Sequence, residues 1–262
     1  MGFFIPILTA VAKSVITGIA ISKAISWLAP KPEIPEFQQD TQAQGVLVNK
    51  QSNNANIPVV YGTRKVGGVR VFLETSGTSN QYLYGAIVLC EGEINNITSI
   101  IVNDSPVTFS ASIANGTTIT SNDSKFGTTI QVQPFFGADD QVASSLLTTL
   151  SSWTSNHKLS GLCYIAFRIT WDNDKYTGIP NIQAIVQGKK ISTFDASSNE
   201  TTGQFSSNPA FCLLDYLTNT RYGKGIPIGD IDIPSFYSAS QVAITQVTPF
   251  SGGSQINLFD CN

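Results

Sequence analysis

Short apolar runs broken by glycine, asparagine and serine follow one another along most of the chain after residue 44. Valine, isoleucine, phenylalanine and tyrosine dominate these runs, which is typical of β-strands. In one run Val69, Val71 and Leu73 occupy alternate positions and predict a single apolar face. The predicted strands are Gly45–Val48, Ile57–Tyr61, Val66–Glu74, Tyr82–Cys90, Ser99–Val102, Thr129–Phe135, Leu162–Thr170, Asn181–Lys189 and Ser254–Phe259. For the last of these, we expect a pairing partner in later residues of a longer polypeptide or in an adjoining chain, because an unpaired strand edge is normally covered.

The N-terminal segment has a different pattern. Residues 3–28 form one apolar run whose only charges are Lys13 and Lys23, and they predict a helix within residues 1–29. The run is long enough to span a bilayer, but a lysine near the centre costs about 3 kcal/mol on insertion. We therefore expect burial against protein partners, with membrane contact and a processed segment as alternatives. The prolines of the linker at residues 30–43 end this helix.

Two further helices are predicted within the β-rich part. The first, Asp140–Trp153, carries Val142, Leu146, Leu147 and Leu150 at helical spacing. The second covers residues 208–218, with Asn208 as its N-cap and Pro209 at its first position. Gly223 is expected to close the turn after it. Its predicted apolar side consists of Ala210, Leu213, Leu214 and Leu217.

Composition supports a folded, mainly β protein. Of the 262 residues, 42% are hydrophobic and only 13% are charged, so the chain can bury a core and is not expected to be disordered. The 15 basic and 18 acidic residues nearly cancel, which argues against a basic surface for sequence-specific nucleic-acid binding. The predicted fold class is mainly β (α+β), with a few short helices.

Candidate chemistry is sparse. His157 is the single histidine, so a multi-histidine metal site is excluded and a catalytic triad has one candidate in a polar stretch. No G-x-S-x-G motif occurs, and the cysteines lack metal-binding spacing. Three of them lie in apolar runs and are expected to act as small buried hydrophobes. We expect no catalytic, cofactor-binding or metal-binding residues. The four cysteines are Cys90, Cys163, Cys212 and Cys261.

Three segments resemble functional motifs without meeting their requirements. Trp171–Gly178 is similar to a calcium loop, but Tyr176 occupies a ligand position and a polar hairpin loop is expected instead. Gly223–Gly229 has the wrong glycine spacing for a dinucleotide loop. Glu91 and Glu93 flank a glycine, and we expect solvated charges in a turn there, with an acidic contact to a partner as the alternative.

Residues 208–225 closely resemble the N-P-A-x-x-L-x-D-x-L-x-x-x-R-Y-G-x-G segment of phage tail tip attachment proteins, the protein J-like central tail hubs of long-tailed phages. Weaker similarity extends over nearly all of residues 44–262. In this motif the helix is expected to point Leu213, Leu214 and Leu217 inward, and an Asp215–Arg221 ion pair is a hypothesis. The residues that match the family motif are Asn208, Pro209, Leu213, Asp215, Leu217, Arg221, Tyr222, Gly223 and Gly225.

The resemblance implies a structural virion protein at the distal end of a tail. It also implies β-barrel or sandwich-like hub regions, the first at residues 44–195 and the start of a second at residues 196–262. Such hubs form homotrimers that close the tail tube and open for the tape measure protein and DNA. The implied partners are the distal tail protein, the tail tube and the tape measure protein. Receptor-binding or fibre proteins, and host membrane contact by residues 3–28, could be added. Relatives are longer, so receptor recognition is not assigned to this chain. The alternative functions are a membrane-attached β-rich surface module and a small β-sandwich binding module.

Overall fold

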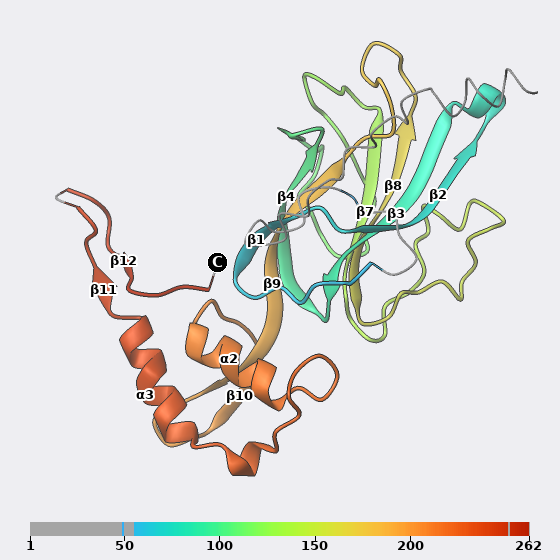
Figure 1. The fold of residues 1–262 in the computed structure, drawn as a ribbon. Coiled ribbons are helices and arrows are strands. Elements are labelled where there is room, and N and C mark those ends of the chain that lie inside the picture. The colour runs from blue at the N-terminus through green and yellow to red at the C-terminus, as the bar shows by residue number, and fades with distance from the viewer. Residues whose placement is uncertain (1–48, 50–54, 251, 262) are drawn as a thin grey trace, which may run out of the picture. The chain divides into compact units, whose positions relative to one another are not determined.

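The mainly β class predicted from the sequence is confirmed. The computed structural model describes Asn49 and residues 55–250 and 252–261, and in these residues two five-stranded antiparallel sheets dominate (Figure 1). The predicted N-terminal helix, the proline-rich linker and the strand Gly45–Val48 lie outside the described residues. Among the helices that are described, none combines the length and apolarity needed to cross a membrane.

The first sheet contains the most accurately predicted strands. β8 has the bounds expected from the sequence, and β3 is one residue longer than expected. The two strands pair antiparallel along their whole length. Consecutive residues in both strands are buried and apolar, so the centre of this sheet is apolar on both faces. In sheet order the strands are β2 (Val69–Ser76), β3 (Tyr82–Glu91), β8 (Leu162–Thr170), β7 (Ile130–Phe136) and β6 (Ile119–Thr120).

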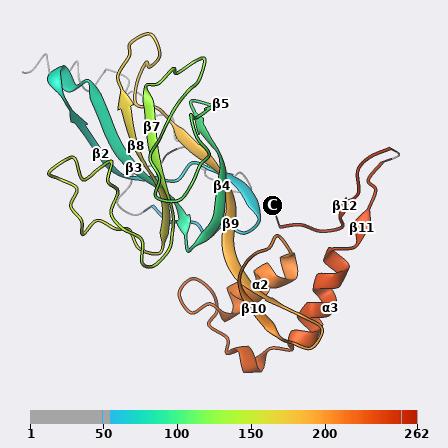
Figure 2. The same cartoon turned by 180° about the vertical axis from the view of Figure 1, so that it is seen from behind.

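The second sheet is built around β9, which is longer than predicted (Figure 2). Its first half pairs with β1 and β4, and its last residues pair with β10. The segment Ile57–Tyr61 is not a strand, because its single pairing is an isolated bridge from Val59 to Glu91. The strands are β1 (Thr63–Val66), β9 (Ile182–Phe194), β4 (Ile94–Val102), β5 (Ser105–Pro106) and β10 (Glu200–Phe205).

A β-bulge changes the predicted face of β2. The pairing register shifts between Arg70 and Phe72, so Val71 is the extra residue and its side chain is 47% exposed. Beyond the bulge Leu73 packs against the core between the sheets, and Phe72 packs on the opposite face. The prediction of one apolar face at Val69, Val71 and Leu73 is therefore wrong, because a single inserted residue reverses the alternation.

The predicted helix Asp140–Trp153 is also wrong. These residues form successive turns, in which Leu147 and Leu150 donate backbone hydrogen bonds to carbonyls three residues earlier. Serine and threonine side chains bond to nearby backbone groups in this stretch and compete with helix formation. Most of the apolar residues are nevertheless buried, since Leu147, Leu150 and Trp153 cover the outer face of the first sheet, whereas Val142 is 67% exposed.

The C-terminal residues add a pair of helices and a short hairpin. α2 (Pro209–Thr218) packs against β9 and against α3 (Ile233–Ala243), a helix that the sequence pattern did not predict. The expected strand Ser254–Phe259 shrinks to β12 (Ile256–Asn257), and its partner is β11 (Gln246–Val247) of the same chain. One edge of this strand is therefore paired within the chain, and its pairing with later residues or an adjoining chain stays a prediction. Two 3-10 turns, η1 (Thr78–Asn80) and η2 (Ile228–Asp230), complete the elements.

Candidate functional site

The helix that carries the family motif begins as the sequence predicts. Asn208 is the N-cap, its side-chain oxygen accepts a 3.0 Å hydrogen bond from the backbone N–H of Ala210, and Pro209 occupies the first turn. The Asn208 amide also donates to the carbonyl of Ser240 at 2.9 Å. One motif residue therefore starts α2 and ties it to α3.

The buried side of α2 differs from the predicted one. Leu214 is buried, at 2% exposure, together with Phe211 and Cys212. Leu213 is 50% exposed and Leu217 is half-buried. The expectation that Leu213 points inward is wrong, because β9 and α3 contact the side of the helix that contains Leu214.

Gly223 is required for a close approach of backbones. A Cβ atom at this position would lie 1.9 Å from the carbonyl oxygen of Tyr216, inside the motif helix. The chain returns there so that Lys224 and Ile226 donate to the carbonyls of Tyr216 and Leu217 at 3.0 and 2.9 Å. Gly223 has no positive φ, so it is not the left-handed cap that the sequence suggested, although it still closes the helix end.

Asp215 is the centre of a polar cluster between α2 and the second sheet. Its Oδ2 accepts hydrogen bonds from the hydroxyls of Tyr61, at 2.5 Å, and Tyr222, at 2.6 Å. Its Oδ1 lies 3.8 Å from the ammonium of Lys189 on β9, and that ammonium lies 5.2 Å from the centre of the Tyr222 ring. A carboxylate with this set of donors holds three separate chain segments together.

Tyr61 reaches Asp215 because its segment lies directly on β9. Lys189 and Gly188 donate backbone hydrogen bonds, both of 2.7 Å, to the carbonyls of Val60 and Gly62. A Cβ at Gly188 would lie 2.1 Å from the Val60 carbonyl oxygen, so only glycine permits this contact. Gly188 therefore allows the backbone on both sides of Tyr61 to lie close to β9, and from there the Tyr61 side chain reaches the motif helix.

The two tyrosines strongly favour their protonated forms. Burial is the main cause that raises the pKa of Tyr61 far above its ordinary value of 10.0, and the neighbouring Asp215 carboxylate adds to it. Burial and Asp215 raise the pKa of Tyr222 in the same way. Both hydroxyls thus remain hydrogen-bond donors at neutral pH, which suits a fixed structural contact and not proton transfer.

The hypothesised ion pair between Asp215 and Arg221 is wrong. Arg221 instead forms an ion pair with Glu91 at the end of β3, while Glu93 pairs with Lys190 at 2.5 Å. The Glu91 side chain is only 17% exposed, so the expectation of solvated turn charges is wrong for Glu91. We call the set Tyr61, Glu91, Lys189, Asp215, Arg221 and Tyr222 the joint, because it connects the β-strand body with the motif helix.

A polar cavity of about 380 Å³ lies beside the joint. Its lining contains as many acidic as basic side chains, so no single sign of charge is available to attract a ligand. We therefore expect the charged side chains of this cavity to pair with one another and with water, and not to bind a small charged molecule. The charged residues in its lining are Glu91, Glu93, Asp139, Lys189, Lys190 and Arg221.

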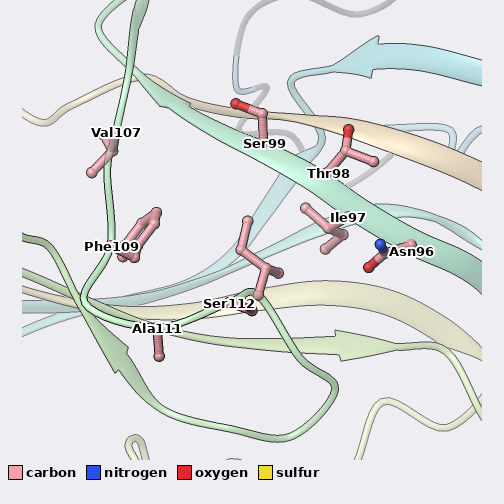
Figure 3. Close-up of a pocket in the computed structure, with 9 residues that line it drawn as sticks. Asn96, Ile97, Thr98, Ser99, Val107, Phe109, Ala111 and Ser112 are labelled. Atoms are coloured by element: carbon pink, nitrogen blue, oxygen red, sulfur yellow. The ribbon is translucent and has the colours of Figure 1, made fainter.

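A second cavity, of about 420 Å³, lies between β4 and the loop that follows β5 (Figure 3). Ile97 lines it from the strand, and Val107 and Phe109 line it from the loop. Its lining contains no ionisable side chain, so it offers no acid, base or nucleophile beyond hydroxyl groups. It is a packing gap without identifiable chemistry.

The remaining candidates lie apart from the joint. His157 is exposed in a loop, where its Nδ1 accepts a 2.9 Å hydrogen bond from the Thr154 N–H. In the Trp171–Gly178 loop, Asp172 pairs with Lys175, and the Tyr176 side chain is buried. No group of three or more histidine, cysteine or acidic residues that could hold a metal ion occurs within residues 55–250 and 252–261 or at Asn49.

Sequence reasoning missed half of the joint. Tyr61 and Lys189 lie in segments that resemble the family, but neither has a local signal for a contact with Asp215. Glu91 was noticed only as one of two carboxylates beside a glycine. Such contacts join residues far apart in sequence, so the pattern of a single segment cannot identify them.

One of the comparisons with known proteins agrees with the motif. No protein-family model matches the chain. The baseplate hub protein pb3 of Escherichia phage T5 is 27% identical over an alignment of 232 positions, and the match covers 71% of this chain and 24% of that protein. The chain thus spans about a quarter of the relative's length. A chain of the virion of a native gene transfer agent particle is 13% identical, with a TM-score of 0.42, and the match covers 56% of this chain and 30% of that one. The predicted resemblance to phage tail hub proteins is confirmed by the match to pb3.

Proposed function

We propose that this chain is a structural protein of a phage tail hub. The observation that carries the proposal is its similarity to the phage T5 baseplate hub protein over 71% of the chain. The motif at residues 208–225 supports it independently, because the structure uses these residues to cap, close and attach one helix. A motif used in this way is typical of packing and assembly, not of catalysis.

The proposal also includes the position of the chain in the tail, its oligomeric state and its role in genome release. The chain would assemble as a homotrimer at the distal end of the tail, close the tube, and open for the tape measure protein and DNA. Its neighbours would be the distal tail protein and the tail tube. Residues 1–29 and 30–43 would be the helix and linker, and 44–195 and 196–262 would be two hub regions. The chain would act without catalysis, as its named structural relative suggests.

An exposed apolar surface near the C-terminal hairpin supports an assembly role. Isolated exposed apolar residues are ordinary, but several in neighbouring segments indicate a contact surface. In this part of the chain they occur at the end of α3 and along the β11–β12 hairpin. The residues of this C-terminal apolar surface are Val242, Ile244, Phe250, Ile256, Leu258 and Phe259, between 40% and 69% exposed.

Locating the chain in particles tests the proposal. Cryo-electron microscopy of purified particles should show its density at the distal end of the tail with threefold symmetry. Density elsewhere in the particle would contradict the proposed place, and absence from particles together with recovery in host membranes would favour the surface-module alternative.

A deletion tests the role of the N-terminal segment. Removing residues 1–30 should harm assembly or genome delivery, while the purified deletion variant keeps the β-sheet signal in circular dichroism. Normal titres would contradict the proposed role. Binding of the full chain, but not of the deletion variant, to lipid vesicles would indicate that host membrane contact is part of it.

A further inference from the structure

Two cysteines that are far apart in sequence meet beside the motif helix. Cys212 lies on α2 and is 4% exposed. Cys261 is half-buried and packs into the same apolar cluster. Both side chains belong to that cluster, and the Cys261 thiol is one of the causes that raise the pKa of Cys212, as expected for neighbouring thiols. A buried thiol next to a more accessible one is the arrangement from which a disulfide can be made.

Backbone contacts hold the two cysteines in this position. The Cys261 N–H donates to the carbonyl of Ser207 at 2.7 Å, and the Ser207 hydroxyl bonds to Asp260 at 2.8 Å. The Cys212 thiol lies 3.6 Å from the carbonyl oxygen of the adjacent Ser206. Residues 206–207 therefore contact both cysteines, so the pair is preorganised and does not depend on a chance collision of a mobile end.

We propose that Cys212 and Cys261 form a redox-sensitive pair that oxidises to a disulfide, and that this bond fastens the segment 244–261 to the motif helix. The segment contains most of the C-terminal apolar surface. The pair would be reduced inside a cell and oxidised outside it. This inference rests on the chain's own geometry and not on the proposed tail function.

The oxidant is a small-molecule disulfide such as oxidised glutathione. The Cys261 thiolate attacks one glutathione sulfur, the glutathione S–S bond breaks, and one glutathione leaves as thiolate and takes up a proton. Cys212 then loses its proton to solvent base, attacks the Cys261 sulfur of the mixed disulfide, and releases the second glutathione. Two protein thiols and one oxidised glutathione thus become one protein disulfide and two reduced glutathione molecules.

Burial, followed by the adjacent Cys261 thiol, raises the pKa of Cys212 to about 12. The first step therefore belongs to the accessible Cys261, and the second step is slow because little Cys212 thiolate exists at neutral pH. Below that pKa, the rate of the second step should rise about tenfold per pH unit.

Peptide mapping of the intact, folded chain tests the pair. The protein is incubated with oxidised glutathione, quenched with acid, alkylated and digested. The expected product is a linked Cys212–Cys261 peptide, with a protein mass lower by two hydrogen atoms. A stable glutathione adduct at Cys261, or two alkylated thiols after long incubation, would overturn the proposal.

Cys90 and Cys163 serve as an internal control. They face each other directly on β3 and β8 and are both fully buried. If proximity of two thiols were sufficient, Cys90 and Cys163 would oxidise as fast as Cys212 and Cys261. Because glutathione cannot reach them, we expect them to stay reduced until the protein unfolds. Linkage of Cys90 to Cys163 in the folded chain before that of Cys212 to Cys261 would contradict the role assigned to access.

Two variants and a digestion assay separate the steps. Cys212→Ser should stop at the Cys261 glutathione adduct, and Cys261→Ser should give neither adduct nor link. If either variant fails to fold by circular dichroism, the wild-type mapping still decides. Limited proteolysis within residues 244–261 should be several times slower in the oxidised than in the reduced wild type, and equal rates would show that the bond does not fasten the segment.

Discussion

The Tyr61 hydroxyl donates a 2.5 Å hydrogen bond to the Asp215 carboxylate across 154 positions of sequence. The contact joins a segment packed on β9 to the helix of the family motif, and Tyr222 donates to the same oxygen at 2.6 Å. Asp215 therefore connects parts of the fold that are far apart in sequence, and its substitution should act on stability before anything else.

Removing the hydroxyl of Tyr61 or Tyr222 should destabilise the protein. Each hydroxyl bonds to a carboxylate in a partly buried place, so Tyr61→Phe and Tyr222→Phe should each lower the free energy of unfolding by about 1.5–3 kcal/mol. Urea denaturation measures both. Because the two donors share one oxygen, the double variant should deviate from the sum of the single ones, and strict additivity would contradict a shared site.

The Arg221–Glu91 ion pair should contribute little to stability. The Arg221 side chain is 74% exposed, so solvent and salt screen the attraction. Arg221→Ala should lower the free energy of unfolding by about 0.2–1 kcal/mol, less at high salt. A loss as large as that of Tyr222→Phe, unchanged by salt, would mean that Arg221 has a structural partner besides Glu91.

Two adjacent leucines on α2 form a matched pair. Leu214 is 2% exposed and Leu213 is 50% exposed. Leu214→Ala should cost about 2–5 kcal/mol by removing buried contacts and leaving a cavity, whereas Leu213→Ala should cost about 0.5 kcal/mol or less. Thermal melts of the two variants compare them directly. Equal costs would show that the buried side of the helix is assigned wrongly.

Substitutions at three glycines distinguish a steric clash between backbones from the cost of a positive φ. Gly223→Ala should severely destabilise the protein, by about 3 kcal/mol or more, since its Cβ would meet the Tyr216 carbonyl oxygen at 1.9 Å. Gly225→Ala should cost about 1 kcal/mol, because φ is +66° but the nearest atoms are 3.6 Å away. Gly229→Ala, with open space and no positive φ, is the control and should be close to neutral. A mild effect at Gly223 would disprove the close approach.

Alkaline pH should weaken the joint. The folded-state pKa values of Tyr61 and Tyr222 lie above the ordinary 10.0, so the folded protein holds these protons more tightly than the unfolded chain. Their contribution to the free energy of unfolding is fully present below about pH 10, and it is lost as the pH rises towards their pKa values in the folded protein. Urea denaturation at increasing pH should show this loss. The Tyr61→Phe, Tyr222→Phe double variant is the control and should lose less stability, because other buried tyrosines affect both proteins equally.

Elements that depend on local physics could be predicted from the order of residues alone. β-branched and aromatic runs predicted β3 and β8 almost to the residue, since their side chains suit a pleated surface. The Asn208–Pro209 start of α2 is equally local, because a cap needs only its neighbouring backbone. The motif itself was recognisable for the same reason, since its cap, helix and turn are contiguous.

The contacts that those elements make depend on the folding of the whole chain. The apolar spacing at Asp140–Trp153 is compatible with either a helix or a series of turns. In the fold the stretch forms turns, and these allow Leu147 and Trp153 to pack on the first sheet. Asp215 was expected to pair with nearby Arg221, yet Tyr61 and Lys189 reach it because Gly188 lets a distant segment lie on β9. Local propensity limits the conformations of a segment, but a helix face or a carboxylate takes its partners from whichever segments the whole chain brings next to it.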